Sequence, residues 1–102
     1  MTVNINGKEY RLHFGCTSVE QFYQRSGVLK QGSFFSAKLY ASVVYAGIYN
    51  EAEKNDTEPD ISFTEVYEWV ETQVFDTEGK AVLERVAAAF QASQALQSFI
   101  KQ

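Results

Sequence analysis

The residues with the greatest chemical potential are His13 and Cys16, each the only one of its kind and spaced as His-x-x-Cys. Zinc sites need three or four protein ligands, so two residues do not make one. A catalytic cysteine needs a neighbouring base and an electropositive pocket. The local pattern places His13 on an outward face and Cys16 near a helix start. We therefore expect an exposed histidine and a small packed thiol.

The acidic residues suggest a calcium loop only at first sight. Asp56, Glu58 and Asp60 have the spacing of its first three ligands, but Ile61 stands where glycine is required and Tyr67 where glutamate is required. We therefore reject a calcium site.

Two further patterns fail to indicate a site. Glu65, Glu68 and Glu71 could pair as acid and base, but their spacing indicates the solvated face of a helix. The six glycines are isolated and form no phosphate-binding cluster. We expect no catalytic residue, no cofactor and no metal, and hence no enzyme.

Composition indicates one folded domain spanning residues 1–102. Apolar residues make up 45% and charged residues 22%, close to the averages for globular proteins. No stretch approaches the roughly 18 apolar residues of a membrane span, and the first residues do not resemble a signal peptide. A single cysteine fits a reducing compartment. We expect a cytoplasmic protein that does not enter membranes.

The net charge of −4 conceals an uneven distribution. Residues 1–50 carry a net +3, residues 51–78 a net −9 and residues 79–102 a net +2. Such polarity suits association with a partner or with a second copy, although an acidic loop is more often simply solvated. The sequence does not indicate a surface rich in both basic and aromatic residues, which is the kind that binds nucleic acid.

The N-terminus predicts a β-hairpin over residues 2–14. Apolar and polar residues alternate on both sides of Asn6-Gly7, the strongest short signal for a two-residue turn. This register pairs Val3 with Tyr10 and places six apolar side chains on one face: Met1, Val3, Ile5, Tyr10, Leu12 and Phe14. An isolated hairpin is at best marginally stable, so this face must dock on the residues that follow.

The remaining chain predicts about four helices, and hence an α+β fold with the hairpin packed on a small helical bundle. A capping box at Thr17–Glu20 predicts a helix over about 18–26, which Gly27 ends. A second capping box at Ser62–Glu65 predicts a helix over about 63–72. Ser33 caps a helix over about 34–50, so apolar that it must be central or covered by a partner. An acidic loop spans 50–60, and Asp76 or Thr77 caps a last helix over about 77–100.

Two groups of residues are candidates for binding a partner. A helix over 77–100 would be about 36 Å long, so its end would overhang the domain and expose Leu96, Phe99 and Ile100; closing the core is the competing role. Tyr45 and Tyr49 lie opposite the main apolar stripe of their helix, where tyrosine serves interfaces well. Core packing is an equal contender for both tyrosines.

The order of motifs over residues 2–75 resembles the tail assembly chaperones of long-tailed bacteriophages and prophages, and related gene-transfer-agent proteins. The motifs follow one another along the chain: Asn6–Tyr10, His13–Gly15, Ser26-Gly27, Leu39–Gly47, the acidic loop and Pro59–Val66. Residues 80–102 depart from the pattern of that family.

The resemblance implies a non-enzymatic protein of the bacterial host cytoplasm that binds the tape measure protein. In that family the chaperone keeps this long apolar partner soluble while tail tube protein polymerises around it, and a longer frameshifted form is often made. Rival interpretations are a minor structural or tail-completion protein of the virion and a small bacterial adaptor or regulatory domain.

Overall fold

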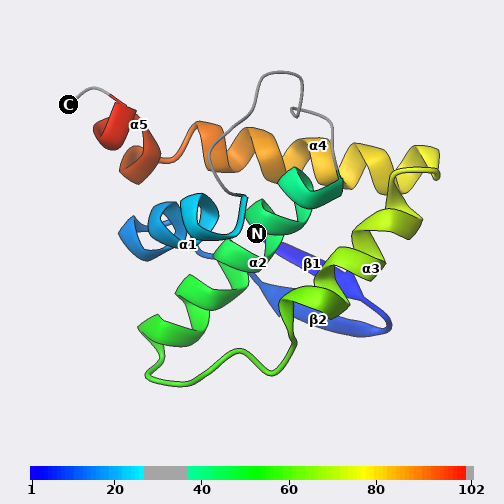
Figure 1. Ribbon diagram of the computed structural model, residues 1–102, viewed down its shortest axis with the longest axis horizontal. Helices are drawn as coiled ribbons and strands as arrows, with labels where there is room; N and C mark the ends of the chain where they lie inside the picture. Colours follow the sequence, from blue (N-terminus) through cyan, green and yellow to red (C-terminus); the bar gives the residue numbers. More distant parts are fainter. Residues whose placement is uncertain (27–36, 101–102) are drawn as a thin grey trace.

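The structure is a computed structural model that describes residues 1–26 and 37–100. It is an α+β fold in which an antiparallel hairpin lies against helices (Figure 1). The elements follow one another along the chain: β1 (Thr2–Ile5), β2 (Lys8–Arg11), α1 (Cys16–Ser26), α2 (Ala37–Lys54), α3 (Phe63–Gln73), α4 (Thr77–Gln91) and α5 (Gln94–Ile100). The described part thus holds five helices rather than about four.

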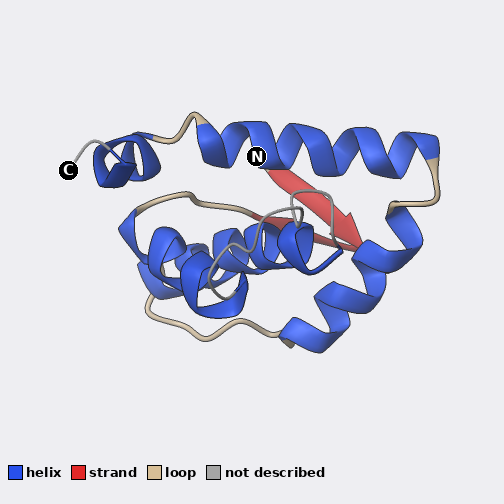
Figure 2. Ribbon diagram, turned by 45° about the horizontal axis from the view of Figure 1, so that its top comes forward, coloured by secondary structure: helices blue, strands red, loops and turns tan. Residues whose placement is uncertain are grey.

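The hairpin has the predicted turn and register. Val3 pairs with Tyr10 and Ile5 with Lys8. Asn6 and Gly7 have φ of 54° and 89°, as a turn with two left-handed residues requires. Val3, Ile5 and Leu12 are buried, whereas Met1 remains half exposed. The hairpin, red in Figure 2, therefore docks through part of its predicted apolar face, with β2 against α2.

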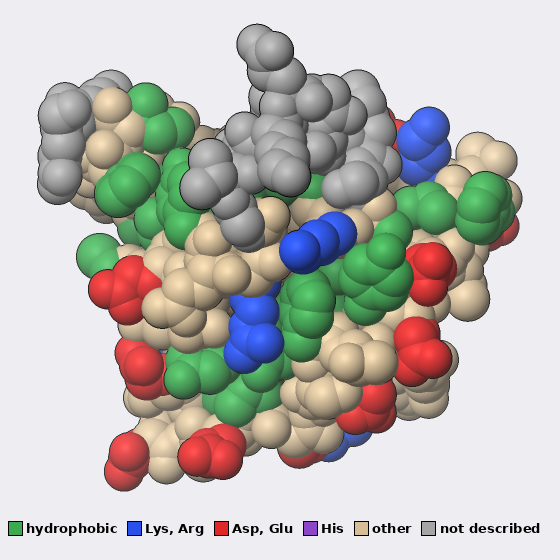
Figure 3. Space-filling view, viewed as in Figure 1, with side chains coloured by type: hydrophobic (Ala, Val, Ile, Leu, Met, Phe, Trp, Pro, Cys, Tyr) green, Lys and Arg blue, Asp and Glu red, His purple; other side chains and the backbone are tan. Residues whose placement is uncertain are grey.

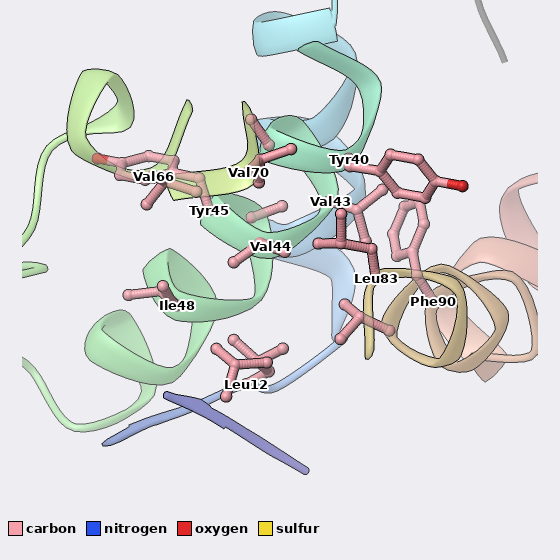
Figure 4. Packing of buried hydrophobic residues seen from close by; sticks show 14 of the residues in the cluster. Leu12, Tyr40, Val43, Val44, Tyr45, Ile48, Val66, Val70, Leu83 and Phe90 are labelled. Atoms are coloured by element: carbon pink, nitrogen blue, oxygen red, sulfur yellow. The ribbon is translucent and has the colours of Figure 1, made fainter. Parts of the chain in front are cut away.

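Helix α2 is the centre of the molecule. Ten of its eighteen residues are buried, and it packs against α1, α3, α4 and the hairpin. Figure 4 shows Val44 of α2 between Val66 and Val70 of α3 on one side and Leu83 and Phe90 of α4 on the other. The central position of this apolar helix, one of the two predicted alternatives, is thus confirmed. The predicted start of this helix at residue 34 and its predicted cap Ser33 lie outside the described residues. The same is true of Gly27, the predicted end of the first helix.

The first helix begins differently from the prediction. It starts at Cys16 rather than at about 18, and the predicted Thr17–Glu20 capping box is wrong. The side-chain oxygen of Asn50, on α2, accepts hydrogen bonds from the backbone N–H groups of Gly15 and Ser18, both at 2.9 Å. These N–H groups at the start of the helix are therefore satisfied by another helix, a cap that local sequence cannot reveal.

The predicted acidic loop at 50–60 begins too early, because α2 continues to Lys54. Asp56 adopts a left-handed φ of 56°, and its N–H donates to the Glu53 carbonyl. The N–H of Thr57 donates to the Ala52 carbonyl, which completes a Schellman motif. Such motifs usually carry glycine, whereas aspartate takes this conformation here. The missing glycine explains why the helix end was misplaced.

The start of α3 follows the prediction. The Ser62 hydroxyl accepts the Glu65 N–H and the Glu65 carboxylate accepts the Ser62 N–H, so the capping box is confirmed. Just before it, Lys8 of the hairpin pairs with Asp60. Their hydrogen bond raises the pKa of Lys8 and lowers that of Asp60. Both side chains are exposed, so this pair adds little stability.

The predicted single helix over 77–100 is wrong, because it divides into α4 and α5 at Ala92 and Ser93. Asp76 caps α4 as predicted. The Ser93 hydroxyl donates to the Phe90 carbonyl and accepts the Leu96 N–H, so serine ends one helix and begins the next. The chain therefore bends after α4, and α5 contacts α1 at the edge of the domain (Figure 1).

We expect Asn50→Ala to lower the free energy of unfolding by about 2 kcal/mol, because the Gly15 and Ser18 N–H groups lose their side-chain acceptor. Urea denaturation measures the change. Asn55→Ala is the matched control, since the Asn55 amide is exposed and its loss should cost less than about 0.5 kcal/mol. Equal losses for the two variants would contradict the role of Asn50.

A second substitution tests the docking of the hairpin. A Cβ at Gly47 would lie 2.9 Å from Leu12 Cβ and 2.9 Å from Phe14 Cε1. We expect Gly47→Ala to destabilise the fold by about 1 to 3 kcal/mol through overpacking, despite better helix propensity. The His13 N–H, which donates to the Gly47 carbonyl, should also exchange faster with solvent. A gain of about 1 kcal/mol, as at an unhindered helix position, would refute this contact.

Candidate functional site

A large groove lies between α1 and α5 in the described part of the chain, and we call it the α1–α5 groove. Its volume is about 970 Å³. The lining comes from the 13–16 connection, from α1 and from α5: His13, Phe14, Gly15, Cys16, Val19, Glu20, Tyr23, Gln24, Gln94, Ala95, Ser98 and Phe99. Figure 3 shows hydrophobic side chains beside the α5 lobe at the upper left.

A continuous row of aromatic rings leads from the core to this groove. Phe14 lies 5.4 Å from Phe90, Phe90 lies 4.9 Å from Phe22, Phe22 lies 5.3 Å from Tyr23, and Tyr23 lies 5.2 Å from Phe99, measured between ring centroids. Phe90 is 2% exposed and Phe99 is 49% exposed. The outer rings are thus held by aromatic contacts while part of their surface remains open to a ligand.

The groove has two apolar ridges at helical spacing. Val19 and Tyr23 are four residues apart on α1, and Ala95 and Phe99 are four residues apart on α5. Side chains four residues apart stand one above the other on a helix. The two ridges meet where the Tyr23 ring contacts the Phe99 ring, so a third helix would pack its side chains across both ridges rather than between them.

The groove holds the two residues that the sequence singles out for chemistry. His13 and Cys16 both line it and both are exposed, so the prediction of a packed thiol is wrong. No lysine or arginine is among the described residues that line it, and the groups near the thiol that could activate it are His13 and the start of α1. Within residues 1–26 and 37–100, no three His, Cys, Asp or Glu side chains gather as a metal site.

The predicted partner-binding residues at the C-terminus separate into two environments. Phe99 lines the α1–α5 groove. Leu96 is buried, and it lines a neighbouring apolar pocket of about 480 Å³ together with the exposed Ile100. Tyr40 also lines that pocket, and burial, followed by the nearby Glu84, raises the pKa of its phenol. Of the three predicted residues at the C-terminus, Phe99 and Ile100 thus present an apolar surface to solvent and Leu96 does not.

The predicted pair Tyr45 and Tyr49 lies elsewhere. Tyr45 is 7% exposed and packs edge-on against Phe63 of α3, so its ring belongs to the core. Tyr49 is half-buried, and its ring centroid lies 6.1 Å from that of Tyr45. Both line a separate pocket at the end of α2.

Tyr23 is a functional candidate that the sequence pattern does not single out, and it lines the α1–α5 groove with part of its ring exposed. Phe22 and Tyr23 are adjacent, and successive residues of a helix point about 100° apart. Two adjacent aromatic residues of one helix therefore cannot both be fully buried in the core. The adjacency of Phe22 and Tyr23 in the sequence thus indicates that one of the two rings is partly exposed. Phe75, between α3 and α4, is a further exposed aromatic, at 92%, but it lines none of these pockets.

Comparison with protein-family models, with curated proteins and with solved structures finds no match to this chain. No helix in the described part of the chain is long and apolar enough to cross a bilayer.

The exposure of Cys16 predicts its reactivity. We expect the native protein to react fully with a thiol reagent such as 5,5′-dithiobis(2-nitrobenzoate), at a rate within about tenfold of the denatured chain, because the sulfur needs no unfolding to be reached. Absorbance of the released thiolate measures the rate. Reaction that requires denaturant would show that the groove is closed in solution.

Proposed function

We propose that this protein is a non-enzymatic binding module that shields an apolar helical segment of a partner in the α1–α5 groove. The observation that carries the proposal is the row of aromatic rings that ends in the half-exposed Phe99. Rings anchored in the core present apolar surface without the entropic cost of ordering flexible side chains on binding. The two ridges at helical spacing favour a helix as the occupant.

The specific function that fits this activity is that of a phage or prophage tail assembly chaperone acting in the bacterial host cytoplasm. Its partner is then the tape measure protein, whose long apolar helical segments need cover until tail tube protein assembles around them. This step rests on the resemblance of residues 2–75 to that family. The groove is the part of the chain that would hold such a segment, and Glu20 is its one carboxylate among the described lining residues.

We expect co-expression to raise the solubility of the tape measure protein of the same phage or prophage, and the two proteins to co-purify. Phe99→Glu should weaken the complex by at least about tenfold, because it places a charge in the α1–α5 groove. Phe75→Glu is the matched control, since it makes the same change on an exposed phenylalanine outside the groove. Calorimetry with the purified partner segment measures both affinities.

The exposed thiol supplies an independent readout of the same prediction. A helix lying in the groove should protect Cys16 from alkylation in the complex, and dissociation of the complex should restore the reaction. Equal loss of binding in the two glutamate variants, or an unprotected Cys16 in a stable complex, would place the partner elsewhere. Presence of the protein in purified virions would instead favour the rival interpretation as a minor structural component.

A further inference from the structure

A second pocket lies at the C-terminal end of α2, where the chain turns into the loop before α3. We call it the α2-end pocket, and its volume is about 540 Å³. Two tyrosines and three acidic residues define its chemistry: Tyr45, Tyr49, Glu53, Asp56 and Glu58. In Figure 1 this loop runs along the bottom, away from α5 at the upper left, so the pocket is separate from the α1–α5 groove.

The pocket favours a cation on electrostatic grounds. No lysine or arginine is among its described lining residues, and in residues 1–26 and 37–100 no ion pair neutralises Glu53, Asp56 or Glu58. Glu53 accepts only the neutral hydroxyl of Thr17. The carbonyl end of α2 adds the negative pole of the helix. Three carboxylates and a helix C-terminus thus act on the same small volume.

The aromatic side of the pocket favours a flat cation. In this same chain the Arg25 guanidinium carbon lies 4.9 Å from the ring centroid of Tyr45 and 5.5 Å from that of Phe63. These rings therefore already accept a guanidinium on one side. Tyr49, half-buried and 6.1 Å from Tyr45, offers the corresponding surface toward the pocket. A guanidinium stacks on such rings and bonds carboxylates in pairs, which an ammonium cannot do.

Contacts within the chain hold part of the pocket wall in place. The Schellman motif holds Asp56 in its left-handed conformation, and the Thr57 hydroxyl donates to the Ala52 carbonyl at 3.0 Å. Tyr45 is fixed edge-on against Phe63, with ring centroids 5.7 Å apart. The backbone turn and the Tyr45 ring therefore need little further ordering when a ligand binds.

We propose that the α2-end pocket binds an arginine side chain of a partner protein. The guanidinium stacks against Tyr49 and pairs with the carboxylates of Glu53 and Glu58, while the partner backbone remains outside. A peptide is the source because the α-carboxylate of free arginine would meet the same three negative charges. The site does not depend on the proposed function, since it neither shares a residue with the α1–α5 groove nor requires an apolar partner.

The test is an NMR titration of the full protein with N-acetyl-arginine methylamide. We expect the backbone amides of residues 49 and 56–58 to shift, with a Kd in the range of about 1 mM or tighter. The neutral citrulline analogue, which has nearly the same shape, should bind at least about tenfold more weakly. Equal binding of citrulline, or no shift at these amides up to about 10 mM ligand, would overturn the proposal.

Paired variants separate a specific site from general attraction to an acidic protein. Glu53→Gln with Glu58→Gln should weaken arginine binding by about tenfold. Glu68→Gln with Glu71→Gln removes the same charge from exposed positions of α3 outside the pocket and should leave the Kd within about twofold. Equal weakening of arginine binding in both double variants would show that binding depends only on the net charge of the protein, and it would refute the site.

Two further comparisons test the ring and the source of the guanidinium. Tyr49→Leu keeps an apolar wall but removes the ring, so it should weaken arginine more than the corresponding lysine derivative. Equal weakening of both would contradict stacking. Free arginine should bind no more tightly than the blocked derivative. Tighter binding of the free amino acid would assign the pocket to a small molecule and overturn the assignment to a partner protein.

Discussion

The junction between α2 and the segment from Leu12 to Ser18 is the contact on which the other elements depend. Three backbone N–H groups of that segment are satisfied by α2: the Gly47 carbonyl accepts the first, from His13, and the Asn50 side chain accepts the other two, from Gly15 and Ser18. The absence of a side chain at Gly47 lets Leu12 and Phe14 approach the helix backbone closely. One helical turn of α2 therefore fixes both where the hairpin ends and where α1 begins.

This junction also places the surfaces that we propose to be functional. Because Gly15 is held against α2, Phe14 reaches Phe90 of α4, and α1 brings Phe22 into the same cluster. The break at Ser93 then turns α5 back toward α1, so that Phe99 stacks on Tyr23. The high aromatic content thus supplies a continuous row of rings that is buried in the core at one end and exposed in the groove at the other. The two proposed sites differ in character because their charges differ: the α1–α5 groove is largely uncharged, whereas the α2-end pocket concentrates carboxylates.

Local sequence was sufficient wherever an element is stabilised by its own residues. The Asn6-Gly7 turn, the register of the hairpin, the Ser62–Glu65 capping box and the Asp76 cap each satisfy backbone groups within a few residues, so a short window contains the whole interaction. The apolar character of α2 likewise indicates that it is covered, while the tertiary structure decides between the core and a partner as its cover. The boundaries that failed have less visible causes: α1 is capped by Asn50 from a distant helix, α2 ends without glycine, and a single serine divides α4 from α5.

The candidate sites show the same division. The sequence by itself determined that the chain is α+β, that it carries aromatic residues in excess, and that its acidic groups concentrate between residues 51 and 78. Only the tertiary structure decided which of these residues are accessible: it buried Tyr45, exposed Tyr23 and Cys16, and brought Phe99 against α1. The physical reason is that composition and periodicity describe one element at a time. The exposure of a side chain depends on the neighbouring elements that cover it, and here those neighbours come from helices distant in the chain.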